Sequence, residues 1–281
     1  MKNILIPTDF SENAWNAITY ALNFFKNEPC NFYLHHVTLI SNYAGGESPP
    51  IPTSSIIDKT LIKHAKVELK NLLKKIKKLP GNANHTFSTL TSYNYFIDAV
   101  REQIEQKKID LIVMGTKGAS GIAEVIIGSN TGDLITKVKC PVLIVPENAR
   151  YKKPKEIAFP TDYNIFYPAD ILNNISQIAN MHNSVIRILH VAKKNEELTE
   201  FQLENKDFLN VFFLDERHSF HKVTNSKIEA GIQCFTESRD IDLIVMIAKS
   251  LNLFEQILFT PTIEEISYHT EIPFLVLHEE N

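Results

Sequence analysis

The sequence predicts an α/β protein built as two tandem three-layer sandwiches, each with a mainly parallel five-stranded sheet. Short apolar runs bounded by turn-forming residues alternate with segments of helical periodicity, which is the pattern of strands joined by crossover helices. The pattern begins twice, at Ile4 and again at Ile157. The 281 residues are enough for two domains of ordinary size, each with its own core.

Strands and helices alternate along the first half. The first strand, residues 2–7, ends in a Thr-Asp-Phe-Ser turn, where Asp9 or Ser11 can cap the next helix. The other strands are expected at residues 32–37, 87–90, 109–114 and 141–145, and the other helices at 56–76, 95–106 and through Leu134, Ile135 and Val138. Right-handed crossovers between successive strands make such a sheet mainly parallel.

The second half repeats the first. Pro160-Thr161-Asp162 mirrors Pro7-Thr8-Asp9, and His190-Val191 mirrors His36-Val37. Residues 109–114 and 241–246 are the same string, Ile-Asp-Leu-Ile-Val-Met, at an offset of 132 residues. We therefore expect one domain at residues 1–147 and a second at 155–281, joined by a short polar linker. The closing strands, residues 141–145 and 273–277, are natural sheet edges, and we expect them to pair within the chain or across a homodimer.

Composition excludes several classes of protein. The chain is 44% hydrophobic and 22% charged, as expected of a globular protein, and it has no apolar run of about 18 residues, so no membrane span is predicted. No secretory signal is predicted. Three cysteines without paired spacing predict a reduced, cytoplasmic setting. The first 150 residues carry a net charge of +4 and the rest −8, so a nucleic-acid partner is not expected.

The strand at residues 109–114 runs into a loop containing Gly115, Gly118, Gly121 and Gly128. Glycines at 115 and 118 would let the backbone adopt positive φ and approach an anion closely. The loop lacks the Gly-Lys-Ser/Thr ending of a Walker A motif, and its glycine spacing is not that of a dinucleotide-binding fingerprint. We interpret it as a phosphate-binding loop.

A helix is expected directly after this loop. Gly128 is followed by Ser129, Asn130 and Thr131, which are residues that favour the N-cap position. A phosphate group would lie against the free N–H groups of the first helical turn, at the positive end of the helix dipole.

The spacing Gly115-x2-Gly118-x9-Gly128-Ser129 resembles the signature G-x2-G-x9-G-[ST] of the ATP-binding branch of the universal stress protein family. With its two fused copies, the chain resembles tandem members of that family over nearly its whole length. The resemblance implies an adenine nucleotide alpha hydrolase-like, Rossmann-like fold. It also implies that the ligand is ATP, or ADP or AMP, with Mg on the phosphates.

The resemblance further assigns a binding set. In ATP-binding members, the aspartate after the first strand contacts adenosine, and main-chain groups at the end of the second strand hold adenine. Asp162 persists in a copy that has lost the glycines, so a structural role for Asp9 in its turn is equally open. The expected set is Pro7, Thr8, Asp9, Val37, Gly115, Gly118, Gly128, Ser129, Asn130 and Thr131.

The corresponding positions of the second copy have changed. Those of Gly115, Gly118, Gly121, Gly128 and Ser129 are occupied by Ile247, Ser250, Leu253, Thr260 and Pro261. Bulky side chains replace the glycines, and a proline lacks the N–H that a serine offers. We therefore expect a single nucleotide per chain.

The sequence shows no recognisable set of catalytic residues. We identify neither a Ser/His/Asp nor a Cys/His arrangement, and the spacing places no paired carboxylates at the glycine-rich loop. His218 and His221 have a spacing that could suit a metal, but no further ligand accompanies them, so no metal site is expected. The expected function is a nucleotide-dependent stress-response regulator that binds ATP in its first domain. The alternatives are a slow ATPase or nucleotidyl-transfer enzyme at the same site, and a ligand-free dimeric interaction module.

Overall fold

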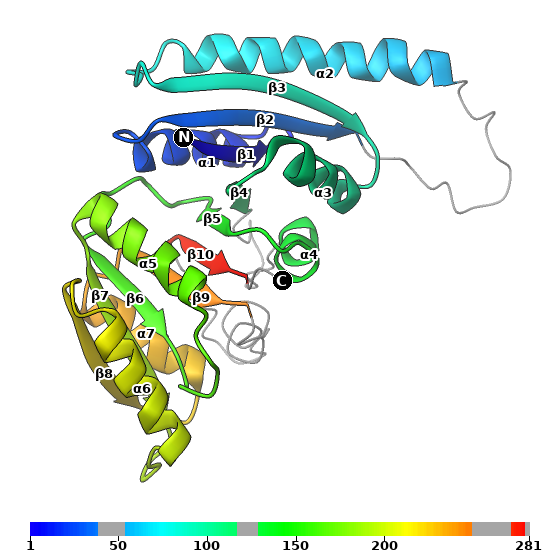
Figure 1. Ribbon diagram of the computed structural model, residues 1–281. Helices are drawn as coiled ribbons and strands as arrows, with labels where there is room; N and C mark the ends of the chain where they lie inside the picture. Colours follow the sequence, from blue (N-terminus) through cyan, green and yellow to red (C-terminus); the bar gives the residue numbers. More distant parts are fainter. Residues whose placement is uncertain (39–53, 117–128, 249–270, 279–281) are drawn as a thin grey trace, which may run out of the picture. The chain divides into compact units, whose positions relative to one another are not determined.

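The computed structural model describes residues 1–38, 54–116, 129–248 and 271–278, and for residues 54–60 and 129 it describes the backbone alone. The chain divides into two compact units, Met1–Gly115 and Thr116–Asn281, which are treated separately below. Figure 1 shows the order of their elements along the chain.

The first unit alternates strands and helices around a parallel sheet. Its elements are β1 (Lys2–Pro7), α1 (Glu12–Phe24), β2 (Cys30–Thr38), α2 (Ser54–Ile76), β3 (His85–Tyr93), α3 (Phe96–Lys107) and β4 (Leu111–Thr116), whose last residue belongs to the second unit. The strand order is β3-β2-β1-β4, and each of these neighbours pairs in parallel. The predicted strand at residues 2–7 is confirmed residue for residue.

The second unit repeats this pattern. Its elements are α4 (Ser129–Lys137), β5 (Val142–Pro146), β6 (Glu156–Pro160), α5 (Ala169–His182), β7 (Val185–Ala192), α6 (Glu200–Phe212), β8 (His218–Thr224), α7 (Ile228–Ser238), β9 (Leu243–Ile247) and β10 (Phe274–Leu277). The pairings β9-β6-β7-β8 are all parallel, as in β4-β1-β2-β3. The predicted α/β class with a mainly parallel sheet is thus confirmed.

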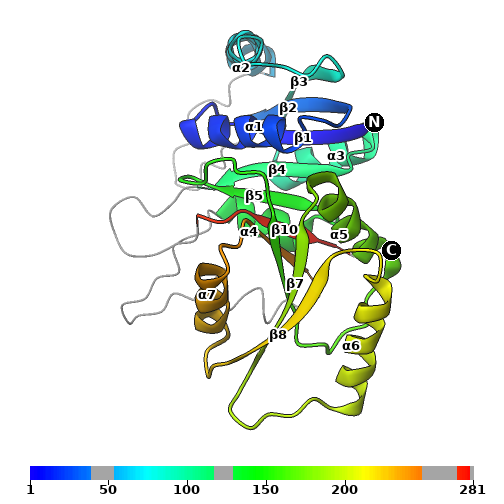
Figure 2. The same cartoon turned by 90° about the vertical axis from the view of Figure 1, so that its left-hand side faces the viewer.

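In each unit the central strands are covered on both faces. Ile4, Leu5 and Ile6 follow one another in β1 and are all fully buried, although their side chains point alternately to opposite faces. All of β9 is buried in the same way. In Figure 2, β7 and β8 lie between α6 and α7. Strands buried on both faces explain why the sequence shows continuous apolar runs instead of alternation.

The closing strands pair with each other within the second unit. β5 and β10 are antiparallel, with Phe274 opposite Ile144 and Val276 opposite Val142. Directly after β10, the imidazole Nε2 of His278 bonds to the backbone oxygen of Ile135 in α4 at 2.7 Å. The predicted pairing of the two sheet edges is confirmed, and it occurs inside one chain.

Candidate functional site

The turn that follows β1 is fixed by its own side chains. The Thr8 N–H donates to the backbone oxygen of His35 at 2.8 Å, and the Thr8 hydroxyl accepts from the Phe10 N–H at 3.1 Å. Phe10 has a φ of 67°, which is rare for a residue with a side chain. The Asp9 carboxylate accepts from the Ser11 N–H at 3.0 Å. Asp9 therefore has the turn-forming role considered from the sequence, while its side chain stays exposed.

Of the two caps that the sequence allows for helix α1, Asp9 and Ser11, the structure shows Ser11. Ser11 has extended backbone angles, and its hydroxyl accepts from the Ala14 N–H at 3.2 Å. His36 supports the turn from β2, because its Nδ1 donates to the Thr8 backbone oxygen at 2.8 Å and its ring stacks on Phe10 at 4.6 Å. These contacts within the protein fix the shape of the turn.

The end of β2 presents backbone groups beyond the end of β1. β1 and β2 pair only as far as Pro7 opposite His35, whereas β2 continues to Thr38. Backbone groups of alternate residues in a strand point to the same side, so those of Val37 point the same way as the His35 carbonyl, toward β1. One donor and one acceptor of Val37 thus face the space past the last residue of β1.

Gly115 lies within β4, and the structure corrects the reason given for this glycine. Its φ is not in the left-handed region, so the predicted positive φ at this position is wrong. A Cβ placed on Gly115 would stand 2.5 Å from the backbone oxygen of Asn13 and 3.4 Å from the Cβ of Ala17. Glycine is needed here because the first turn of α1 packs directly on the strand.

The α4 segment lies in the second unit. The helix begins at Ser129, so Ser129, Asn130 and Thr131 form its first turn instead of preceding it as caps. The N-terminal end of a helix carries a partial positive charge from the helix dipole. Asn130 is exposed and Thr131 is 2% exposed. Gly118, Gly121 and Gly128 lie outside the described residues.

The first unit brings together half of the predicted binding set. Pro7, Thr8 and Asp9 lie at the carboxyl end of β1, Val37 lies at that of β2, and Gly115 lies at that of β4. These three strands are neighbours and run in parallel. In open α/β sheets, ligands bind beyond the carboxyl ends of the strands, so this edge is the candidate site.

The second half contains the same turn. The Thr161 hydroxyl accepts from the Tyr163 N–H at 3.1 Å, and the Asp162 carboxylate accepts from the Asn164 N–H at 3.0 Å. Tyr163 has a φ of 60°, and His190 Nδ1 bonds to the Thr161 backbone oxygen at 3.1 Å. The Pro-Thr-Asp turn is therefore a structural unit that persists with or without the glycine-rich loop.

Side chains from α6 seal this second turn. The Gln202 amide donates to the Asp162 backbone oxygen at 2.7 Å, and the Asn205 amide donates to the Tyr163 backbone oxygen at 2.8 Å. Both amides belong to buried residues. Sequence reasoning missed them. The signal available was the capping box Thr199-x-x-Gln202, which locates the start of α6 but not the reach of its amides.

The helix after this turn also starts later. α5 begins at Ala169, seven residues after Asp162, whereas α1 begins at Glu12, three residues after Asp9. In the extra residues, the Tyr167 hydroxyl bonds to the Thr161 hydroxyl, and burial raises the pKa of Tyr167. The helix that follows the turn thus starts four residues later than in the first half.

The second half has a side chain at the position that corresponds to Gly115. Ile247 occupies it and is 3% exposed. In the second half, therefore, amides from α6 bond to the turn and an isoleucine replaces the glycine.

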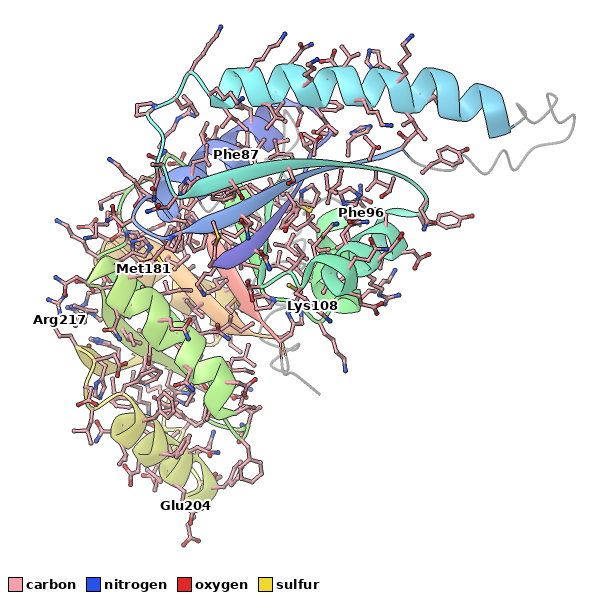
Figure 3. The ribbon with its side chains drawn as sticks, turned by 45° about the horizontal axis from the view of Figure 1, so that its top comes forward. Phe87, Phe96, Lys108, Met181, Glu204 and Arg217 are labelled. Atoms are coloured by element: carbon pink, nitrogen blue, oxygen red, sulfur yellow. The ribbon has the colours of Figure 1, made fainter. Side chains whose placement is uncertain are left out.

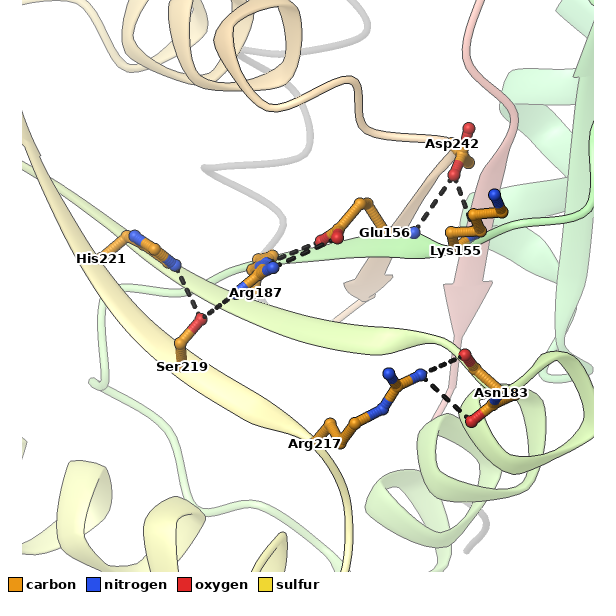
Figure 4. A network of polar contacts seen from close by, with 8 residues as sticks. All are labelled: Lys155, Glu156, Asn183, Arg187, Arg217, Ser219, His221 and Asp242. Atoms are coloured by element: carbon orange, nitrogen blue, oxygen red, sulfur yellow. Dashed lines mark hydrogen bonds and ion pairs between the residues drawn. The ribbon is translucent and has the colours of Figure 1, made fainter.

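The two histidines considered for metal binding have partners within the protein. His218 Nε2 lies 3.0 Å from the Asn210 side-chain oxygen, and His221 Nε2 lies 2.8 Å from the Ser219 hydroxyl. The Ser219 hydroxyl also accepts a hydrogen bond from Arg187, which forms a bidentate ion pair with Glu156 (Figure 4). Among the described residues, no group of three or more His, Cys, Asp or Glu is placed to hold a metal, and no described helix is long and apolar enough to cross a bilayer.

Comparison with known proteins decides the family. The universal stress protein family model matches residues 1–146. The chain belongs to the universal stress protein family. It is 33% identical over 155 residues to universal stress protein MJ0531 of Methanocaldococcus jannaschii, which covers 55% of this chain and 84% of that protein. It is 28% identical over 144 residues to universal stress protein A homolog 1 of Coxiella burnetii, covering 51% of this chain and 95% of that protein.

Solved structures of universal stress proteins extend the likeness to the whole chain. A universal stress protein from Archaeoglobus fulgidus matches with a TM-score of 0.73 and 16% identity, covering 98% of both chains. A putative universal stress protein from Pseudomonas aeruginosa matches with a TM-score of 0.60 and 13% identity, covering 99% of this chain and 93% of that one. At these identities the likeness concerns the fold.

Proposed function

We propose that this universal stress protein binds ATP, or ADP or AMP, in its N-terminal half, with Mg on the phosphates, and acts as a nucleotide-dependent regulator of the stress response. The observation that carries the proposal is the string Gly115-x2-Gly118-x9-Gly128-Ser129, which meets the four fixed positions of the family's ATP-binding signature. The proposal places the protein in the cytoplasm, where free thiols such as those of its cysteines persist.

The nucleoside would occupy the edge formed by β1 and β2. The backbone N–H and C=O of Val37 offer a donor and an acceptor side by side, which suits the edge of an adenine base. The exposed Asp9 carboxylate is held by its turn and can accept hydrogen bonds from ribose hydroxyls. A binding edge that is already ordered loses little conformational entropy when the ligand arrives.

The phosphates would bind to backbone N–H groups. Ser129, Asn130 and Thr131 supply the first turn of α4, where the helix dipole favours negative charge. The loop that contains Gly118 and Gly128 would complete the phosphate-binding site. Mg would neutralise the remaining phosphate charge, as it does when it binds through substrate phosphates and water.

The proposal is for binding without fast hydrolysis. The sequence assigns no general base to the site. Asp9, the acidic residue of the expected set, accepts the Ser11 N–H and so helps to form its turn. A slow ATPase at the same site is the alternative, and steady-state release of phosphate from ATP distinguishes the two. A regulator would hold ATP over many minutes with little phosphate released.

Isothermal titration of the full chain with ATP and Mg tests the proposal. Gly118→Val should abolish binding, because a β-branched side chain disfavours positive φ and would fill space that the phosphate needs. Gly81→Val is the matched control, since Gly81 is exposed and a Cβ there would meet nothing closer than 4.0 Å. Equal affinity of wild type and the Gly118 variant would overturn the proposal, provided that both unfold at the same temperature.

A further inference from the structure

The outward side of α6 carries apolar side chains that are exposed. Val211 is 64% exposed, Leu203 is 48% exposed and Phe208 is 45% exposed. At the start of the helix, Phe201 packs edge-to-face against Phe166, which is itself 75% exposed. Single exposed apolar residues are ordinary, but a continuous group on one helix face marks an interaction surface.

Acidic side chains lie among these apolar groups. Glu200, Glu204 and Asp207 are exposed, and Figure 3 shows Glu204 extending away from α6. The one lysine of α6, Lys206, lies 5.5 Å from the ring of Phe220 in β8 and so turns toward the sheet. We define the acidic apolar face of α6 as Glu200, Leu203, Glu204, Asp207, Phe208 and Val211.

Helix α2 has the opposite character. Its buried side includes Ala65, Leu69 and Ile76, and its outward side is rich in lysine. Leu61 and Val67 are 48% and 50% exposed among these lysines. We define the basic face of α2 as Lys63, Lys66, Val67, Lys70 and Lys74, all of which are exposed.

We propose that copies of this chain associate head to tail, with the acidic apolar face of α6 in one copy against the basic face of α2 in another. The charges of the two faces are complementary, and each face offers apolar groups that the contact would bury. The 13 residues of α6 span about 20 Å and the 23 residues of α2 about 35 Å, so α6 can lie along α2 for its whole length.

The charge of the two halves supports this choice of partner. Residues 1–150 carry a net charge of +4 and residues 151–281 carry −8, so approach of unlike halves of two copies is attractive, whereas approach of two second halves is repulsive. A contact of α6 with α6 would bring Glu204 and Asp207 of each copy together. The second copy is therefore bound through α2.

Light scattering and sedimentation velocity on the full chain test the proposal. We expect reversible association that weakens at least about tenfold between 0.05 and 0.5 M salt, because exposed charges are screened within a few ångströms at the higher concentration. Glu204→Lys/Asp207→Lys should weaken association at least about tenfold, and so should Lys66→Glu/Lys70→Glu. All four side chains are exposed, so circular dichroism should show both variants folded.

Mixing the two variants provides the decisive measurement. Each variant alone opposes like charges in the contact. A mixture pairs the reversed α6 with the reversed α2, and also the unaltered α2 of one variant with the unaltered α6 of the other, so it should restore association. Glu102→Lys/Glu105→Lys is the matched control, because it makes the same charge change with the same spacing on the exposed side of α3 and should leave association unchanged.

Three results would overturn the proposal. These are a wild-type chain that stays monomeric at 100 μM and low salt, an α2 variant that associates like wild type, and a control variant that dissociates as far as the α6 variant. The first would leave the two faces without this partner. The second would show that α2 is not part of the contact. The third would show that the α6 variant loses association because its net charge has changed, whatever the position of the charges.

Discussion

Gly115 lies against Asn13 so closely that a Cβ on the glycine would stand 2.5 Å from the asparagine's backbone oxygen. The contact joins the end of β4 to the first turn of α1, and backbone atoms cannot move aside as a flexible side chain can. We expect Gly115→Ala to lower the free energy of unfolding by about 1–3 kcal/mol, the usual cost of overpacking. Urea unfolding followed by circular dichroism measures the change.

Gly81→Ala is the control for this experiment. Its Cβ would meet only the backbone oxygen of Leu79 at 4.0 Å, so its effect should lie between neutral and a gain of about 1 kcal/mol from the stiffer unfolded chain. If both alanine variants unfold at the same urea concentration, the role assigned to Gly115 is wrong.

Gly115 also shows where sequence reasoning reached the right residue for an incomplete reason. The spacing of the glycines identified the position, but a sequence does not reveal which backbone will pack on a given strand. The strands, the Ser11 cap and the pairing of β5 with β10 were all predictable, because each depends on a local pattern or on the symmetry of the repeat. The seal formed by Gln202 and Asn205 was not, because it depends on where α6 lies in three dimensions.

Loss of that seal should destabilise the protein. Gln202→Leu and Asn205→Leu each leave a buried backbone oxygen without its donor, which costs about 1–3 kcal/mol of unfolding free energy. Gln106→Leu, which removes an exposed amide bonded to Glu102, should change stability by less than about 0.5 kcal/mol. Chemical denaturation compares the three variants, and equal effects at buried and exposed amides would count against the seal.

Stability should fall as the pH drops below neutrality, partly through His35. This residue is fully buried, and burial, with a smaller effect of neighbouring His36, lowers its pKa from 6.5 to about 4. Between these values the unfolded chain binds a proton that the folded chain does not. The free energy of unfolding therefore falls with falling pH at up to about 1.4 kcal/mol per pH unit for this histidine.

His35→Leu should reduce that slope. Leucine suits the position, since Leu189 is its counterpart in the second half and is fully buried there. Urea unfolding at several values between pH 7 and pH 4 would measure the slopes of both proteins, and His64→Leu, at an exposed histidine of α2, should keep the wild-type slope. The role of His35 is refuted if its variant keeps that slope too.

One nucleotide should bind per chain, as the substituted glycines predict and as the sealed second turn supports. The Asp162 and Tyr163 backbone oxygens already accept amides of α6, so a nucleoside there would have to break two buried hydrogen bonds. Isothermal titration should give a stoichiometry of one, and Gly118→Val should abolish it entirely. Two equivalents of ATP on the wild-type chain, falling to one on the variant, would show that the second half binds nucleotide after all.

The pairing of β5 with β10 has a consequence for synthesis on the ribosome. β10 begins 128 residues after β5 ends, so at roughly 5–20 residues per second β5 emerges roughly 6 to 26 seconds before its partner. During that interval one side of β5 is an open edge that another strand can occupy, including β5 of a neighbouring nascent chain. β5, the last strand of the first sequence repeat, thus gains its partner only when nearly the whole second repeat has been translated.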